Sequence, residues 1–130
     1  MATYLLDTTV LIDHLAGRPR VVEHVRRLAE EGHTLAVCCI NVAEAFAGAH
    51  EHEKAAVERL LGSLDHLQVG MEIARRAGQY QYHYARQGRT ILTSDAIIAA
   101  TAVAHGATLV TANVQDFPMP ELAVQPLPSV

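Results

Sequence analysis

Four carboxylates hold equivalent places in the sequence, each after an apolar, strand-like run or in the first turn of the helix that follows it. They are Asp7, Glu44, Asp95 and Asp116. If the strands are parallel, these positions share one edge of a sheet, where the sites of open α/β proteins gather. Two unit charges 4 Å apart repel by roughly 4 kcal/mol at an effective dielectric constant of about 20. The cluster therefore requires raised pKa values or a bound cation.

The ligand chemistry of this cluster favours a particular cation. Carboxylate oxygens, with no usable His or Cys ligands beside them, suit Mg²⁺ or Mn²⁺ rather than zinc. Such a metal makes a bound water more acidic and neutralises charge on a phosphodiester, and two metals about 3.5–4 Å apart can stabilise both reacting oxygens. The acids therefore indicate metal-dependent phosphodiester hydrolysis. The net charge of −4 is compatible with this chemistry, because the metal supplies the local positive field.

Two of these acids also have structural explanations. Asp7 stands at a strand-to-helix junction, where Asp is common in turns and as an N-cap. Glu44 closes an Asn-x-x-Glu pattern that begins at Asn41, which is typical of a capping box. Neither explanation excludes a role in the cleft, and the sequence leaves both open.

The elements that position the acids follow from apolar runs and helix signals. Short buried runs predict strands at Thr3–Leu6, 34–40, 66–69 and 108–111, with an edge strand at 122–125. Amphipathic stretches between them predict helices over 8–17, 19–32, 41–49, 51–64, 71–88 and 93–106. This alternation predicts an α/β fold, a three-layer α/β/α arrangement around a mostly parallel central sheet.

Several local assignments are specific enough to test. Thr8 or Thr9 is expected to cap the first helix, and Thr93 and Ser94 are expected to cap the helix that opens with Asp95. That last helix is almost free of charge, so it should be buried on most sides. Tyr80 and Tyr84 share one face of the preceding helix. Packing is the expected role of this pair, and stacking on nucleotide bases is the alternative.

Composition narrows the class of protein. The 130 residues, 50% hydrophobic and 18% charged, predict one globular domain over residues 1–130. No apolar run approaches the roughly 20 residues of a membrane span, and no signal peptide is evident, so a cytoplasmic location is expected. Cys38 and Cys39 are adjacent without a CxxC or His partner spacing, which favours buried, reduced thiols.

Three blocks resemble the signature segments of PIN-domain ribonucleases, and VapC-type toxins of toxin–antitoxin pairs most of all. The blocks are LLDTTVLID, NVAEAF and SDAIIAATAVAHGATLVTANVQDF, and the resemblance runs from Tyr4 to Phe117. It implies that Asp7 and Asp95 bind Mg²⁺ (or Mn²⁺) directly. It implies that Glu44 acts as a ligand through water or as the general base. Thr8 and Thr111 would supply hydroxyls that line the site.

The sequence departs from the family pattern at the last acidic position. The family places an acid either at the TxN/D position or three residues later, and here these residues are Asn113 and Asp116. Either Asp116 supplies the fourth carboxylate, or Asn113 holds a water while a second metal binds weakly. The number of metal ions therefore stays open.

The resemblance also implies partners: an RNA substrate, a VapB-like antitoxin whose C-terminal segment covers the acidic groove, and a second copy of the chain in a homodimer. An acidic cleft would attract a basic side chain. Six arginines are candidates for phosphate contacts at the rim of the groove, or are solvated helix charges: Arg18, Arg20, Arg26, Arg27, Arg86 and Arg89.

Two other classes of function compete with a Mg²⁺-dependent endonuclease. A catalytically weak PIN-like module could act mainly by binding protein or RNA, given the neutral Asn113 and the absence of a basic surface. A receiver-like domain phosphorylated on Asp7 would need a second adjacent acid and a late lysine, whereas the only lysine is Lys54. No glycine-rich phosphate loop or serine-elbow motif supports nucleotide hydrolysis or acyl transfer.

Overall fold

The computed structural model describes residues 1–127 and contains a sheet of five parallel strands. The strands are β1 (Thr3–Leu6), β2 (Thr34–Cys38), β3 (Asp65–Leu67), β4 (Thr108–Thr111) and β5 (Val124–Pro126). Their order is β3-β2-β1-β4-β5, so the chain builds outward from β1 on one side and then returns to its other side. The carboxyl end of β1 is thus a topological switch point, which is where ligands bind in open α/β sheets. This arrangement confirms the predicted α/β fold, with every strand pair parallel.

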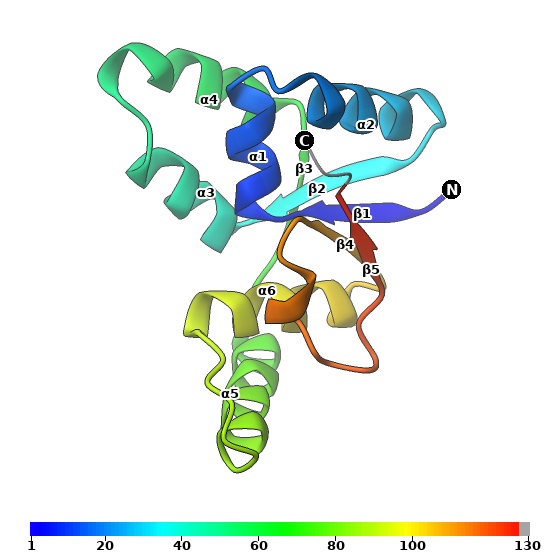
Figure 1. Cartoon of the computed structure of the whole chain (residues 1–130). Helices are drawn as coiled ribbons and strands as arrows, with labels where there is room; N and C mark the ends of the chain where they lie inside the picture. The colour runs from blue at the N-terminus through cyan, green and yellow to red at the C-terminus, as the bar shows by residue number, and fades with distance from the viewer. Residues whose placement is uncertain (128–130) are drawn as a thin grey trace.

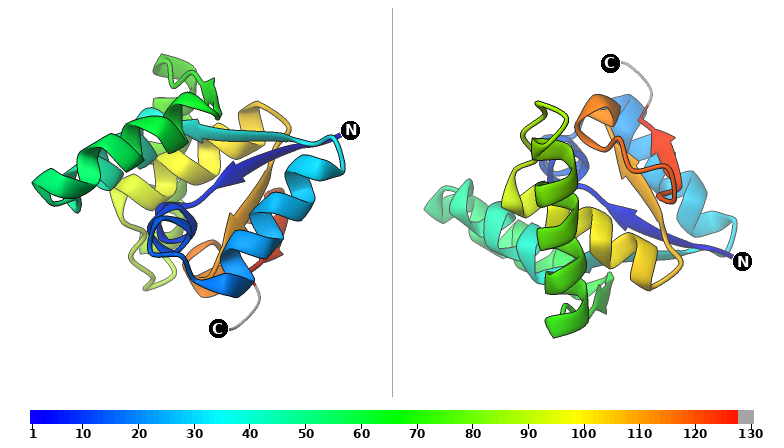
Figure 2. Two further views of the ribbon diagram at one scale, coloured as in Figure 1. Left: turned by 90° about the horizontal axis from the view of Figure 1, so that it is seen from above. Right: turned by 90° about the horizontal axis from the view of Figure 1, so that it is seen from below.

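Helices cover both faces of the sheet (Figures 1 and 2). They are α1 (Thr8–Leu15), α2 (Pro19–Glu30), α3 (Cys39–Ala47), α4 (Lys54–Gly62), α5 (Met71–Ala85) and α6 (Thr93–Ala104), with short 3₁₀ turns η1 (Glu51–Glu53) and η2 (Val114–Asp116). Figure 1 shows α1, α2 and α4 above the sheet and α5 and α6 below it, with α3 leading away from the carboxyl end of β2. The three-layer α/β/α prediction is confirmed.

The layer formed by α5 and α6 is held by a core of small and aromatic residues. Ala99 and Ala100 of α6 are completely buried, and Ile98 is almost so, which confirms the burial predicted from the absence of charge. Tyr80 and Tyr84 of α5 are buried against this helix. Their packing role is confirmed. Gly106 ends the segment at φ 65°, a conformation that glycine adopts without steric cost.

The opposite layer buries the apolar stripe of α2. Val21, Val25 and Leu28 recur at helical spacing and pack with Leu6 of β1 and Val10 of α1. Pro19 occupies the first turn of α2, where its missing N–H has no intrahelical partner to lose. This packing fixes α1 directly behind the carboxyl end of β1.

Three local assignments from the sequence are wrong. The second strand ends at Cys38 and not at residue 40, so Cys39 begins α3 and is exposed, whereas Cys38 is buried as expected. Neither Thr8 nor Thr9 caps α1, because Asp7 does so with its own carboxylate. Leu92 is the N-cap of α6 and provides no side-chain hydrogen bond, so the hydroxyls of the following two residues are not caps.

Within residues 1–127, no helix is long and apolar enough to cross a membrane.

Candidate acidic site at the carboxyl edge of the sheet

Asp7 lies at the end of β1 and is only 5% exposed. Its backbone N–H donates to the Val110 carbonyl at 2.9 Å, which fixes the residue against β4. Its Oδ1 accepts from the Thr8 backbone N–H at 2.9 Å, and its Oδ2 accepts from Thr111 Oγ1 at 2.7 Å. Burial raises the pKa of Asp7, an effect that these hydrogen bonds oppose and that the negative charge of Glu44 reinforces. Asp7 therefore caps α1 and also lies at the predicted edge.

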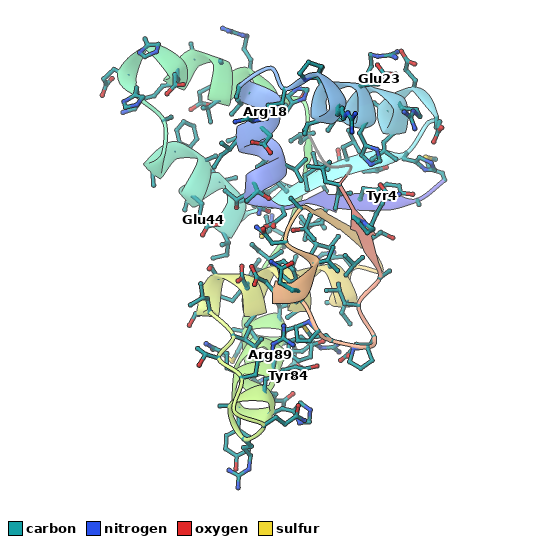
Figure 3. The ribbon with its side chains drawn as sticks, in the orientation of Figure 1. Tyr4, Arg18, Glu23, Glu44, Tyr84 and Arg89 are labelled. Carbon is teal, nitrogen blue, oxygen red and sulfur yellow. The ribbon has the colours of Figure 1, made fainter. Side chains whose placement is uncertain are left out.

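Glu44 lies on α3 and reaches the first turn of α1 (Figure 3). Its Oε1 accepts a hydrogen bond from Thr8 Oγ1 at 2.6 Å, across 36 residues of sequence. The capping box expected between Asn41 and Glu44 is wrong, because the N-cap of α3 is Cys38, three residues earlier than the pattern suggested, and Asn41 is its capping-box partner. The carboxylate of Glu44 is therefore directed toward the end of β1 rather than toward its own helix terminus.

Asp95 occupies the first turn of α6 and is half-buried. The turn that leads into it is braced by Gln81 of α5, whose Nε2 donates to the Ile91 carbonyl and to Thr93 Oγ1, both at 3.0 Å. Burial first, and then the negative charges of Asp7, Asp116 and Glu44, raise the pKa of Asp95 to about 6. Every group that shifts this pKa raises it. The negative charges of the other three predicted acids therefore all act on Asp95.

The loop after β4 carries both candidates for the fourth position, Asn113 and Asp116. Asp116 ends η2, is exposed, and adds its negative charge to the field on Asp95. Asn113 contributes its backbone N–H, which donates to Thr111 Oγ1 at 3.0 Å. The guanidinium of Arg89 donates to the Gln115 carbonyl, which ties the connection between α5 and α6 to this loop (Figure 3). The charge of Asp116 thus acts on Asp95, and the backbone of Asn113 supports Thr111.

Thr8 and Thr111, which the resemblance named as lining hydroxyls, each donate to one acid of the cluster. One buried residue at this edge was given the wrong role by the sequence pattern. The side chain of Asn41 is completely buried and donates from Nδ2 to Thr8 Oγ1 at 3.2 Å. The Asn-x-x-Glu pattern concealed this contact because the same spacing fits a helix cap.

Three of the other arginines proposed for phosphate contacts have partners on the protein surface. Arg18 pairs with Asp13 at 3.2 Å, and Arg26 pairs with two glutamates of its own helix. Arg86 packs its guanidinium 4.9 Å from the centre of the Tyr82 ring. Arg89, through its contact with the loop of Asp116, is the one of these four joined to the acidic edge.

The donor set suits a hard divalent cation. Each of the four acids offers carboxylate oxygens, and none of the groups acting on Asp95 offsets the negative charge. Within residues 1–127, however, no three His, Cys, Asp or Glu side chains are drawn together closely enough to form a metal cage. The acids act on Asp95 from an open arrangement, and the chemistry of their oxygens is what suits a hard divalent metal.

Comparisons with known proteins decide the family. The PIN domain family matches residues 4–118 of the chain. Among curated proteins, the ribonuclease VapC19 of Mycobacterium tuberculosis is 37% identical over 115 residues, 88% of this chain and 92% of that protein. The ribonuclease VapC2 of Haemophilus influenzae is 31% identical and covers 90% of this chain and 91% of its own. The chain is a PIN domain of the VapC family.

Two solved structures agree with this assignment. The VapBC-1 structure from nontypeable Haemophilus influenzae matches with a TM-score of 0.80 at 30% identity, covering 96% of this chain and 98% of that one. A toxin–antitoxin complex from Klebsiella pneumoniae matches with a TM-score of 0.81 at 26% identity, covering 98% and 99%. The VapC-family fold therefore extends over nearly the whole of this chain.

Proposed function

We propose that this PIN domain is a metal-dependent endoribonuclease that acts as the toxin of a toxin–antitoxin pair. The observation that carries the proposal is the placement of buried Asp7 at the end of β1, with the carboxylate of Glu44 held beside it by Thr8. Burial, and then the negative charges of Asp7, Asp116 and Glu44, raise the pKa of Asp95 in the same region. A site that gathers acids from β1, α3, α6 and η2 is suited to hold a cation against a phosphodiester. The VapC relatives named as ribonucleases support RNA as the substrate.

Asp7 and Asp95 would hold the metal directly, with Glu44 and Asp116 completing the set, and Mg²⁺ or Mn²⁺ fits these oxygens. When bound, such an ion neutralises charge on the phosphodiester and makes an attacking water more acidic. The protein's own residues orient the ligands and accept the proton. Thr111 and the Thr8 backbone fix both oxygens of Asp7, so its orientation is set before any ligand arrives.

Glu44 is the candidate general base. Its Oε1 is held by Thr8, which leaves the carboxylate anchored at one oxygen and directed toward the same edge as Asp7. A base in this position is able to accept a proton from an attacking water beside the phosphodiester. Asp116 is exposed at the rim, where it can complete the ligand set as the substrate binds.

The test is cleavage of RNA by the purified protein with Mg²⁺, with Mn²⁺ and with excess chelator. Asp95→Asn removes one charge at nearly constant shape, and Asp65→Asn, on the exposed edge of β3, is the matched control. Metal-dependent cleavage that Asp95→Asn abolishes and Asp65→Asn retains is the expected result. Absence of any cleavage by folded, metal-bound protein would favour a module that acts mainly by binding.

We also propose a VapB-like antitoxin, homodimerisation and a cytoplasmic site of action. The Klebsiella pneumoniae complex and the VapBC-1 complex support the antitoxin, because both are toxin–antitoxin assemblies. A basic side chain on the antitoxin would pair with the acids and displace the metal. Co-expression with a cognate VapB-like antitoxin should give a complex that does not cut RNA. Light scattering on the isolated chain should give twice its mass of 14.1 kDa.

A further inference from the structure

Asn41 lies near the acidic edge and has no role in the chemistry proposed above. It has no exposed surface, and a buried amide must find partners for both its oxygen and its nitrogen. Its Oδ1 accepts from the Cys38 backbone N–H at 2.9 Å. Because that N–H can only donate, the oxygen of the amide must face Cys38 and the nitrogen must face the other way.

The nitrogen faces Thr8. Asn41 Nδ2 lies 3.2 Å from Thr8 Oγ1, and Thr8 Oγ1 lies 2.6 Å from Glu44 Oε1. An amide NH₂ group only donates, so the threonine oxygen is the acceptor in the first contact. The hydroxyl has one proton, and the carboxylate of Glu44 can only accept when ionised. The proton of Thr8 is therefore directed at Glu44.

We propose that Asn41 is a positioning residue for the nuclease reaction, which acts through the Thr8 hydroxyl to hold Glu44 at one oxygen. The inference rests on the proposed function, in which Glu44 is the base. Asn41 also accepts from the N–H of Cys38, the N-cap of α3, and this capping contact can be kept while the contact with Thr8 is removed. A matching relay holds the other side of the site, where the Asn113 N–H donates to Thr111 Oγ1 and Thr111 donates to Asp7. In both threonines, a donor N–H occupies the hydroxyl oxygen, so the hydroxyl proton points toward the acid.

Asn41→Asp tests the direction of these hydrogen bonds, because it replaces the donor NH₂ group by an acceptor at nearly constant shape. The carboxylate keeps an acceptor for the Cys38 N–H but has no donor for Thr8, so the hydroxyl is free to turn away from Glu44. Loss of such a supporting contact typically costs about 10–100-fold in activity or metal affinity, and we expect a loss in that range. Thr8→Val should give a comparable loss, and Thr8→Ser, which keeps the hydroxyl, should restore most of the activity.

The double variant separates positioning from mere structural support. If Asn41 acts through Thr8, Asn41→Asp should add little to the loss already caused by Thr8→Val, in both RNA cleavage and Mn²⁺ affinity. Equal losses from Asn41→Asp in the wild-type and Thr8→Val backgrounds would overturn the inference. Circular dichroism checks that each variant is folded. If Asn41→Asp does not fold, the comparison of Thr8→Val with Thr8→Ser and the spectrum described next test the inference.

A measurement on wild-type protein keeps this inference distinct from the proposed function. In a ¹H–¹⁵N spectrum, the side-chain amide protons of Asn41 should exchange slowly with solvent and show a nuclear Overhauser contact to Thr8. Thr8→Val should shift the Asn41 signal. Rapid exchange with no contact to Thr8 would refute the relay even in an active enzyme. Failure of wild-type protein to cut RNA would refute the proposed function and leave this spectrum to decide the relay.

Discussion

Replacing Asp95 by Asn should stabilise the metal-free protein while it abolishes activity. The pKa of Asp95 is raised from 3.8 to about 6 by burial and by three neighbouring carboxylates. At about 1.36 kcal/mol per pKa unit, this rise corresponds to at most roughly 3 kcal/mol of unfavourable free energy for the charged form at neutral pH. Asp95 is only half-buried, so solvent screening reduces the figure to on the order of 1 kcal/mol.

The sign of the pH dependence follows from the direction of the shift. A carboxyl group with a raised pKa in the folded state binds its proton more tightly there than in the unfolded chain. Its contribution to the free energy of unfolding is complete below pH about 4 and is lost as the pH rises through about 6. Asp95→Asn cannot ionise, so its advantage over wild type should be largest at pH 7 and should disappear near pH 4.

Urea denaturation in excess chelator at pH 7 and at pH 4 measures this advantage directly. At pH 7 the midpoint of Asp95→Asn should correspond to about 1 kcal/mol of extra stability, or a few degrees in the thermal midpoint. Asp65→Asn, on exposed β3, is the matched control and should leave both midpoints unchanged. An Asp95→Asn variant that is less stable than wild type at pH 7, or whose advantage grows as the pH falls, would refute the electrostatic reasoning.

Three further predictions follow from the same contacts. Metal affinity should fall as the pH drops through about 6, because protonated Asp95 is a poor ligand, and equal calorimetric affinities at pH 5.5 and 7.5 would contradict this. Thr111→Val removes the hydroxyl that donates to buried Asp7 and should cost roughly 1–3 kcal/mol in urea denaturation together with most of the activity, whereas Thr111→Ser should retain both. Tyr80→Phe removes a hydrogen bond to Glu121 at 2.9 Å and should cost roughly 0.5–1.5 kcal/mol with RNA cleavage unchanged, so a loss of cleavage would show that this part of α5 reaches the site.

The sequence was sufficient to predict the sheet and the places of the acids. Apolar β-branched runs such as Thr108–Thr111 have few alternatives to a buried strand, and acids that follow such strands must meet at one edge. The burial of α6 followed in the same way from its lack of charge. These features depend on periodicity and composition, which local sequence carries.

The errors concern boundaries and long-range hydrogen bonds. Asn41 looked like the N-cap of a helix because the pattern ending at Glu44 fits one, whereas it is the third residue of α3 and its side chain accepts from the N-cap Cys38. That start is set by the end of β2 in the sheet and not by propensity. The contact between Thr111 and Asp7 joins residues 104 positions apart, and no local signal specifies it.

Binding of Mn²⁺, measured by electron paramagnetic resonance on wild-type protein and on Asp7→Asn and Asp95→Asn, tests the central claim most directly. If the four acids form one metal site, each substitution should weaken Mn²⁺ binding by at least about tenfold, and Asp65→Asn should not change it. Unchanged Mn²⁺ affinity in both Asp7→Asn and Asp95→Asn would contradict the claim that the carboxyl edge of this sheet is the metal-dependent catalytic centre.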